Sequence, residues 1–89
     1  MKISKQQEAW IDQVSNENPE ALQIDGHDNA IIGISRKSGE PALLAYSEKR
    51  IIMNLVTFDG MSLEEAREFY EFNIAGAYMG PGTPVIVGD

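Results

Sequence analysis

The single histidine of the chain lies in a segment with the residue types of a metal site. In Asp25-Gly26-His27-Asp28, two carboxylates flank the imidazole. A metal centre needs several converging ligands, and one histidine with an Asp-x-x-Asp pair is a small set. The spacing also lacks the regular Asp-x-Asp-x-Asp-Gly pattern of a calcium loop. We therefore predict no metal site and no cofactor. We expect Asp25 and Asp28 to make side-chain turns that cap backbone amides, with a weak divalent-cation site as the alternative.

A second polar segment, EFNIAGAYMGPGTP at residues 71–84, combines glycines with the side chains of Asn73, Tyr78 and Thr83. A phosphate-binding loop follows a strand and opens a helix, and its Walker form also carries a lysine. Here the glycines follow a predicted helix and precede a predicted strand, and no basic residue is near. We therefore predict that three glycines only end the helix and return the chain to a last strand: Gly76, Gly80 and Gly82.

The two polar segments are candidates for the walls of one ligand site. Both adjoin predicted strands, and a pocket between residues 25–29 and 73–83 would hold a small molecule or a metal ion, or serve as an enzyme active site. The side chains that must converge there are Asp25, Asp28, Asn73 and Tyr78. The alternative is that these side chains only tie the two segments together.

The predicted third helix, from Ser62 to about Ala75, has two contrasting sides. At about 100° per residue, one apolar stripe should face the core: Leu63, Ala66, Tyr70, Ile74 and Ala77. Away from this stripe lie four acids and two aromatic rings: Glu64, Glu65, Glu68 and Glu71, with Phe69 and Phe72. We expect the predicted first helix, which carries Trp10, to cover the two rings. The alternative is an exposed aromatic patch rimmed by acids, as at a partner or dimer surface.

Capping and periodicity signals predict the elements that position these side chains. Ser4 with Gln7, and Ser62 with Glu65, have the capping-box pattern, and Ser47 is a third helix cap. We predict helices at residues 5–16, 48–58 and 62–75 and strands at residues 30–35, 42–46 and 84–87. The second helix should be largely buried, because its apolar residues cover much of its circumference: Ile51, Ile52, Leu55, Val56 and Phe58. The order α-β-β-α-α-β predicts one α+β domain over residues 1–89, with a three-stranded, mostly antiparallel sheet packed with three helices.

Composition excludes several classes of function. Fourteen acids against seven bases give a net charge of −7, which disfavours direct binding to nucleic acid. The acidic third helix would be repelled by DNA phosphates, although it follows another helix as a recognition helix does. The chain has no cysteine, which excludes disulfides and thiolate chemistry and fits the reducing cytoplasm. We expect no signal peptide and no membrane-spanning segment, because no apolar run approaches about 20 residues.

Three segments carry a family resemblance. They are Asp25-Gly26-x-Asp28-x-Ala30-Ile31-Ile32-Gly33, then Asp59-Gly60-Met61-Ser62-x-Glu64-Glu65-Ala66, then Glu71-Phe72-Asn73-Ile74-Ala75-Gly76-Ala77-Tyr78 with Gly80, Thr83 and Pro84. Together they are similar to a family of small uncharacterised proteins encoded by tailed bacteriophages and prophages. The resemblance implies a phage gene product that acts in the cytoplasm of an infected bacterium. The resemblance does not assign any particular activity to the chain.

The leading functional hypothesis is a non-enzymatic, acidic interaction protein. It would bind and inhibit a host or phage macromolecule with a basic surface, such as a nuclease, a polymerase or a defence complex. The contact residues would be Glu64, Glu65, Glu68 and Glu71, with Phe69 or Phe72 as an aromatic anchor. A homodimer with Phe69 and Phe72 at its interface is a further hypothesis. The ligand site between residues 25–29 and 73–83 is the alternative from a different class of protein.

Overall fold

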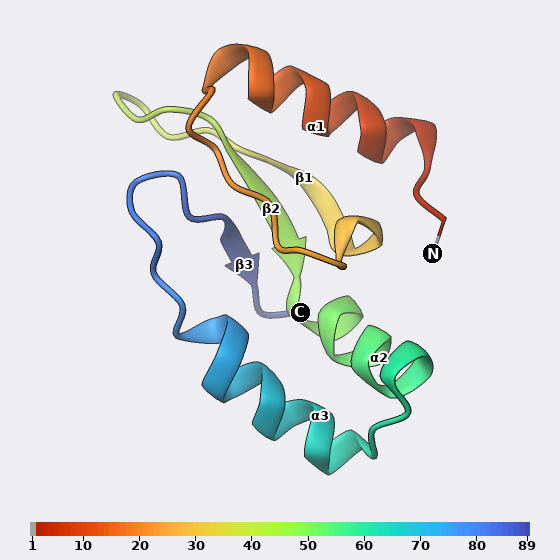
Figure 1. Cartoon of the computed structure of the whole chain (residues 1–89). Helices are drawn as coiled ribbons and strands as arrows, with labels where there is room; N and C mark the ends of the chain where they lie inside the picture. The colour runs from red at the N-terminus through yellow and green to blue at the C-terminus, as the bar shows by residue number, and fades with distance from the viewer. Residues whose placement is uncertain (1) are drawn as a thin grey trace.

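The computed structural model describes residues 2–89 and has the predicted α+β architecture (Figure 1). In chain order its elements are α1 (Lys5–Glu17), the 3-10 turn η1 (Asp28–Ala30), β1 (Ile31–Ser35), β2 (Leu43–Ser47), α2 (Glu48–Asp59), α3 (Leu63–Tyr70), the π-helical turn η2 (Glu71–Ala75) and β3 (Val85–Val87). The order α-β-β-α-α-β is therefore confirmed. Over residues 2–89, no helix has the length and the apolar character needed to cross a membrane.

The three strands form one sheet in the order β1-β2-β3, with β2 at the centre. β1 and β2 are antiparallel and follow each other through a short connection, whereas β3 pairs with β2 in parallel. A parallel pairing needs a long crossover connection, and here that connection contains α2 and α3. The predicted mostly antiparallel sheet is confirmed, with the β2–β3 pair as its one parallel pairing.

The helix starts follow the predicted caps. Ser4 Oγ accepts from the N–H of Gln7 at 3.0 Å, and the Gln7 side chain accepts from the N–H of Ser4 at 2.9 Å. Ser62 and Glu65 make the same reciprocal pair at 3.1 and 3.0 Å. These bonds satisfy amide groups that the first turn of a helix leaves without partners. Local sequence alone therefore fixes where α1 and α3 begin.

The hydrophobic core lies on one face of the sheet. Ile31, Tyr46 and Ile86 are paired in register across the three strands, and residues directly opposite one another share a face. The buried apolar side chains form a single cluster on this side: Val14, Ala30, Ile31, Ala42, Leu44, Tyr46, Ile51, Leu55, Ala66 and Tyr70. α1, α2 and α3 each contribute to this cluster, so all three helices depend on the same buried surface.

Buried polar side chains attach the irregular parts of the chain to this core. Gln7 Nε2 donates to the backbone oxygens of Asn29 and Ile31 at 2.8 and 3.0 Å, and Asn18 Nδ2 donates to the backbone oxygen of Ala42 at 3.0 Å. α1 is thereby fastened to the sheet near both of its ends. These three bonds satisfy backbone carbonyls that would otherwise be costly to bury.

The predicted burial of α2 and α3 holds away from the α2–α3 connection and fails next to it. Ile51 and Leu55 of α2 are fully buried, but Phe58 in its last turn is exposed. Ala66 and Tyr70 of the α3 stripe are buried, whereas Leu63 in its first turn is exposed. The two helices pack against each other, and this packing leaves both of these side chains near the α2–α3 connection open to solvent. Ala77 is also exposed, because it follows the end of the helix and the helical projection no longer applies to it.

We predict that Tyr46→Phe destabilises the protein by about 1–3 kcal/mol. Tyr46 is 0% exposed, and its hydroxyl oxygen accepts from the backbone N–H of Ile24 at 2.9 Å, so removing it leaves that amide without a partner. The measurement is urea unfolding at neutral pH. Tyr78→Phe is the matched control, because Tyr78 is 77% exposed and should change stability by less than about 0.5 kcal/mol. Equal effects of the two changes would contradict the prediction.

Candidate functional site

The predicted partner-binding residues form an exposed surface on α3 and η2. We call this surface the acidic–aromatic face, and it consists of Glu64, Glu65, Glu68, Phe69, Glu71 and Phe72, all of them exposed. Phe72 is 86% exposed and Phe69 is 40% exposed. The expectation that the first helix would cover these rings is wrong. α1 packs against β1 and β2 and lies across the molecule from α3 (Figure 1).

The two aromatic rings border a shallow groove. It has a volume of about 340 Å³ and is lined by Met61, Glu65, Glu68, Phe69 and Phe72. Phe72 covers none of the core, so its ring is available to another molecule. The groove thus combines apolar side chains with two carboxylates, which is the composition predicted for a contact surface.

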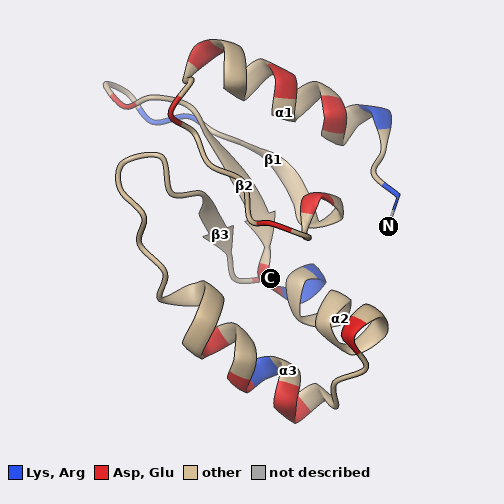
Figure 2. Cartoon of the chain, viewed as in Figure 1, with Lys and Arg blue, Asp and Glu red and all other residues tan. Residues whose placement is uncertain are grey.

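The acids of this face differ in their local roles. Glu65 accepts from the N–H of Ser62, and this bond lowers the pKa of its carboxyl. Glu65 is therefore first a helix cap. Glu71 lies toward a neighbouring groove of about 570 Å³ between α2 and α3, where Lys49 and Arg67 are also present. Figure 2 shows acids along α3 and also along α1, so negative charge is not confined to the acidic–aromatic face.

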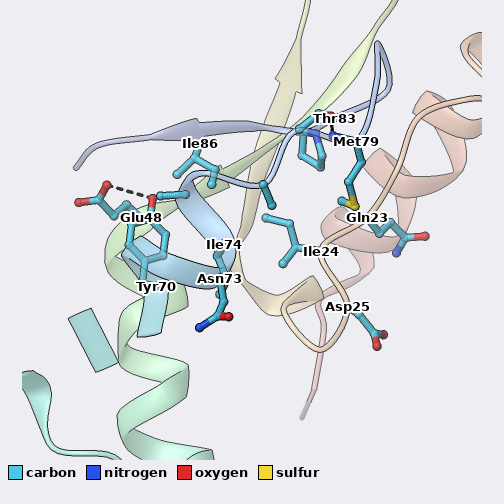
Figure 3. A pocket seen from close by; sticks show the side chains of 13 residues that line it. Gln23, Ile24, Asp25, Glu48, Tyr70, Asn73, Ile74, Met79, Thr83 and Ile86 are labelled. Carbon is cyan, nitrogen blue, oxygen red and sulfur yellow. Dashed lines mark hydrogen bonds between the residues drawn. The ribbon is translucent and has the colours of Figure 1, made fainter. Parts of the chain in front are cut away.

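The two polar segments found in the sequence do meet, and a pocket of about 540 Å³ lies between them (Figure 3). Its walls come from residues 23–25, from the start of α2, from α3 and η2, and from β3 with the chain that leads into it. The lining residues are Gln23, Ile24, Asp25, Glu48, Tyr70, Asn73, Ile74, Ala75, Ala77, Met79, Thr83, Pro84 and Ile86. The pocket therefore lies beside the predicted location, with Asp25 as its one lining residue from the segment 25–29.

Only two of the four predicted convergent side chains belong to this pocket. Asp25 and Asn73 line it, whereas Asp28 and Tyr78 do not. Asp28 Oδ1 accepts from Gln23 Nε2 at 3.0 Å, so it bonds a side chain and not the backbone amide that we expected it to cap. Tyr78 projects into solvent, because the chain has already left the helix at that point. The predicted convergence of all four side chains is therefore wrong.

The pocket has a polar pair that sequence reasoning missed. Tyr70 Oη donates to Glu48 Oε2 at 3.1 Å, and both residues line the cavity. Burial, followed by the nearby Glu48 carboxylate, raises the pKa of the Tyr70 hydroxyl well above its ordinary range. Tyr70 belongs to the apolar stripe of α3 by periodicity, and nothing local indicates that its hydroxyl reaches a residue 22 positions earlier. The hydrogen bond between Tyr70 and Glu48 forms only because α3 packs against α2.

The loop before β3 is held by its own bonds. Thr83 Oγ1 donates to the backbone oxygen of Gly80 at 2.7 Å and accepts from the N–H of Met79 at 2.8 Å. The backbone oxygen of Gly82 accepts from the N–H of Leu22 at 2.9 Å, which joins the two pocket walls. The Thr83 hydroxyl therefore makes its hydrogen bonds within the loop, and these bonds hold the turn in the absence of a ligand.

His27 is a buried structural residue. Its Nδ1 lies 3.1 Å from Asn54 Nδ2, and Asn54 also exchanges two side-chain hydrogen bonds with Asn29. The amide NH₂ of Asn54 is a donor, so Nδ1 accepts and the neutral ring with its proton on Nε2 fits this network. Burial lowers the pKa of His27, opposed by the carboxylates of Asp59, Asp25 and Asp28. Among residues 2–89, no three His, Cys, Asp or Glu side chains are grouped so that they could hold a metal ion.

No protein-family model, curated protein or solved structure matches this chain, so the candidate sites are judged from their own geometry.

We predict that Gly82→Ala loosens the joint between the two pocket walls and destabilises the protein by about 1–3 kcal/mol. A Cβ at this position would lie 2.0 Å from the backbone oxygen of Glu20, and a backbone atom cannot swing away as a side chain would. Chemical denaturation measures the loss. Gly88→Ala is the control, because no atom lies within 4 Å of a Cβ built there. A Gly82→Ala protein as stable as the control would show that this contact does not hold the walls.

We also predict that His27 makes the protein less stable in mild acid. A histidine with a lowered pKa in the folded state contributes stability that is present above its unfolded value of 6.5 and is lost as the pH falls through its folded pKa. Urea unfolding at pH about 7.5 and about 5.5 measures this loss, in a window above the range where carboxylates protonate. His27→Gln, which can still accept from Asn54, should lose less stability between the two pH values. Identical losses would contradict the assignment.

Proposed function

We propose that this protein is a non-enzymatic, acidic interaction protein of a phage or prophage. It binds a host or phage macromolecule that presents a basic surface, such as a nuclease, a polymerase or a defence complex, and inhibits it in the cytoplasm of the infected bacterium. The observation that supports this proposal is the exposure of Phe72 and Phe69 among the acids of α3. The family resemblance of the three sequence segments supplies the phage context.

The aromatic rings provide the contact energy in this proposal. Burying a phenylalanine side chain that is otherwise in water is worth about 1.5–3 kcal/mol. Phe72 keeps almost all of its surface in solvent, so this energy is still available for a partner. Aromatic anchors of this kind near the centre of an interface carry much of the binding energy of protein complexes.

The acids select the partner. At a net charge of −7, the protein attracts a basic surface and repels an acidic one during diffusional encounter. Direct binding to nucleic acid is disfavoured by the same charge, because neutralising phosphates requires Lys and Arg. A protein that itself binds nucleic acid has the complementary basic surface, and occupying that surface would inhibit it.

The test uses two variants of the acidic–aromatic face. The first is the triple reversal of Glu64, Glu68 and Glu71 to Lys, which leaves the Glu65 cap intact and changes the net charge from −7 to −1. The second is Phe72→Ala. Proteins captured from a bacterial lysate by the wild-type chain are identified, purified and titrated against each variant by calorimetry. We expect each variant to bind at least about tenfold more weakly.

The matched control reverses three exposed acids elsewhere, Glu8, Asp12 and Glu20, and gives the same net charge. It should retain most of the affinity, because the face itself is unchanged. If both face variants bind every partner as tightly as the wild type, the acidic–aromatic face is not the contact surface.

Sedimentation of the purified protein at several concentrations tests the homodimer hypothesis separately. A dimer interface formed by Phe69 and Phe72 would be lost in Phe72→Ala.

A further inference from the structure

The pocket between residues 23–25 and the chain leading into β3 is distinct from the acidic–aromatic face. None of its lining residues belongs to that face. We propose that this pocket binds a small organic cation, namely an aliphatic or aromatic body that carries a protonated amine. This proposal is independent of the proposed function, because it concerns different residues and a different class of partner.

The first argument is the size and chemistry of the walls. A volume of about 540 Å³ falls in the range of roughly 300–1,000 Å³ that is usual for small-molecule sites. Ile24, Ile74 and Ile86 come from three separate parts of the chain, and Figure 3 shows their side chains around one common space. All three are only partly buried, so an apolar group in the pocket would remove more of their surface from water.

The second argument is the sign of the charge. Among the residues from 2 to 89 that line this pocket, the charged ones are Asp25 and Glu48, and both are acids. Figure 3 shows Glu48 at one end of the cavity and Asp25 at the other. Glu48 also lines the neighbouring groove between α2 and α3, which differs from this pocket because Lys49 and Arg67 line it as well. Both carboxylates lie at the outer ends of the cavity and point away from its apolar centre (Figure 3), so the ends of this pocket favour a cation over an anion.

The third argument is the orientation of the Glu48 carboxylate. Its Oε2 accepts from the buried Tyr70 hydroxyl, which fixes the side chain against the wall of the pocket. The second carboxylate oxygen makes no hydrogen bond to another residue in the range 2–89 and is available to an ammonium group. A charge-assisted hydrogen bond to an amine is stronger than one between neutral groups.

The fourth argument is that the cavity is formed before the ligand arrives. The Ile24 N–H is bound to Tyr46, the N–H of Leu22 is bound to Gly82, and Thr83 closes the turn that carries Met79. Both walls are thus tied to the core or to each other by hydrogen bonds. A preformed site loses less entropy when it binds.

The experiment compares three probes of similar size and different charge: 2-phenylethylamine, 2-phenylethanol and phenylacetate. Each is titrated into ¹⁵N-labelled full-length protein, and amide chemical shifts are followed at low salt. We expect the amine to shift the amides of residues 23–25, 73–77 and 85–86 and to bind about three- to fivefold more tightly than the alcohol. Phenylacetate should bind more weakly than either, and added salt should weaken only the amine.

Two variants locate the charge that is recognised. Glu48→Gln and Asp25→Asn should each reduce amine affinity about two- to fivefold and leave the alcohol unchanged. Glu40→Gln, an exposed acid in the β1–β2 connection, is the control and should have no effect. Phe72→Ala should also leave amine binding unchanged. The proposed role of the acidic–aromatic face in binding a macromolecule is therefore tested separately from the pocket. The proposal is overturned if the amine fails to bind at millimolar concentration, if it shifts residues 64–69 and 72 in place of the pocket, or if the alcohol binds as tightly.

Discussion

The buried hydroxyl of Tyr46 and the amide of Ile24 form the contact on which the rest of the structure depends. Tyr46 lies at the centre of the sheet, paired in register with Ile31 on one side and Ile86 on the other. Its ring fills the core, and its hydroxyl secures the irregular segment that runs between α1 and β1. Desolvation is the largest effect and raises the pKa of this phenol to about 12, so the neutral, hydrogen-bonding form persists at any physiological pH. Because Ile24 also lines the pocket, this core contact positions one wall of a surface site.

α3 connects the core to both candidate surfaces. Its buried side, Ala66 and Tyr70, anchors the helix, and Tyr70 also presents its hydroxyl to Glu48 at the edge of the pocket. Its other side, continued by η2, holds Phe69 and Phe72 in solvent. One short helix thus separates an apolar pocket with acidic ends from an acidic surface with aromatic rings. The residues that define each surface include acids and no bases, in a chain with twice as many acids as bases.

Much of the fold follows from local rules. Capping boxes at Ser4 and Ser62 set two helix starts, and alternating or continuous apolar runs set the strands to within about a residue. The sequence predicts that the glycine-rich return after η2 lies near residues 25–29, and in the structure Asp25 and Asn73 line one pocket while the Gly82 carbonyl accepts from the N–H of Leu22. The sequence does not specify where the individual side chains point. Its pattern predicts that Tyr78 reaches this site, but the helix ends before Tyr78 and its ring points into solvent.

The sequence by itself determined the α-β-β-α-α-β order, the acidic charge and the absence of thiol chemistry, because these depend on composition and on contacts between residues a few positions apart. Only the tertiary structure decided which surfaces stay open. Whether a helix covers Phe72, and whether Tyr70 meets Glu48, depends on how α1, α2 and α3 are arranged on one face of the sheet. Such contacts join residues far apart in the chain, and helical periodicity specifies which side of a helix is apolar without specifying what lies against it.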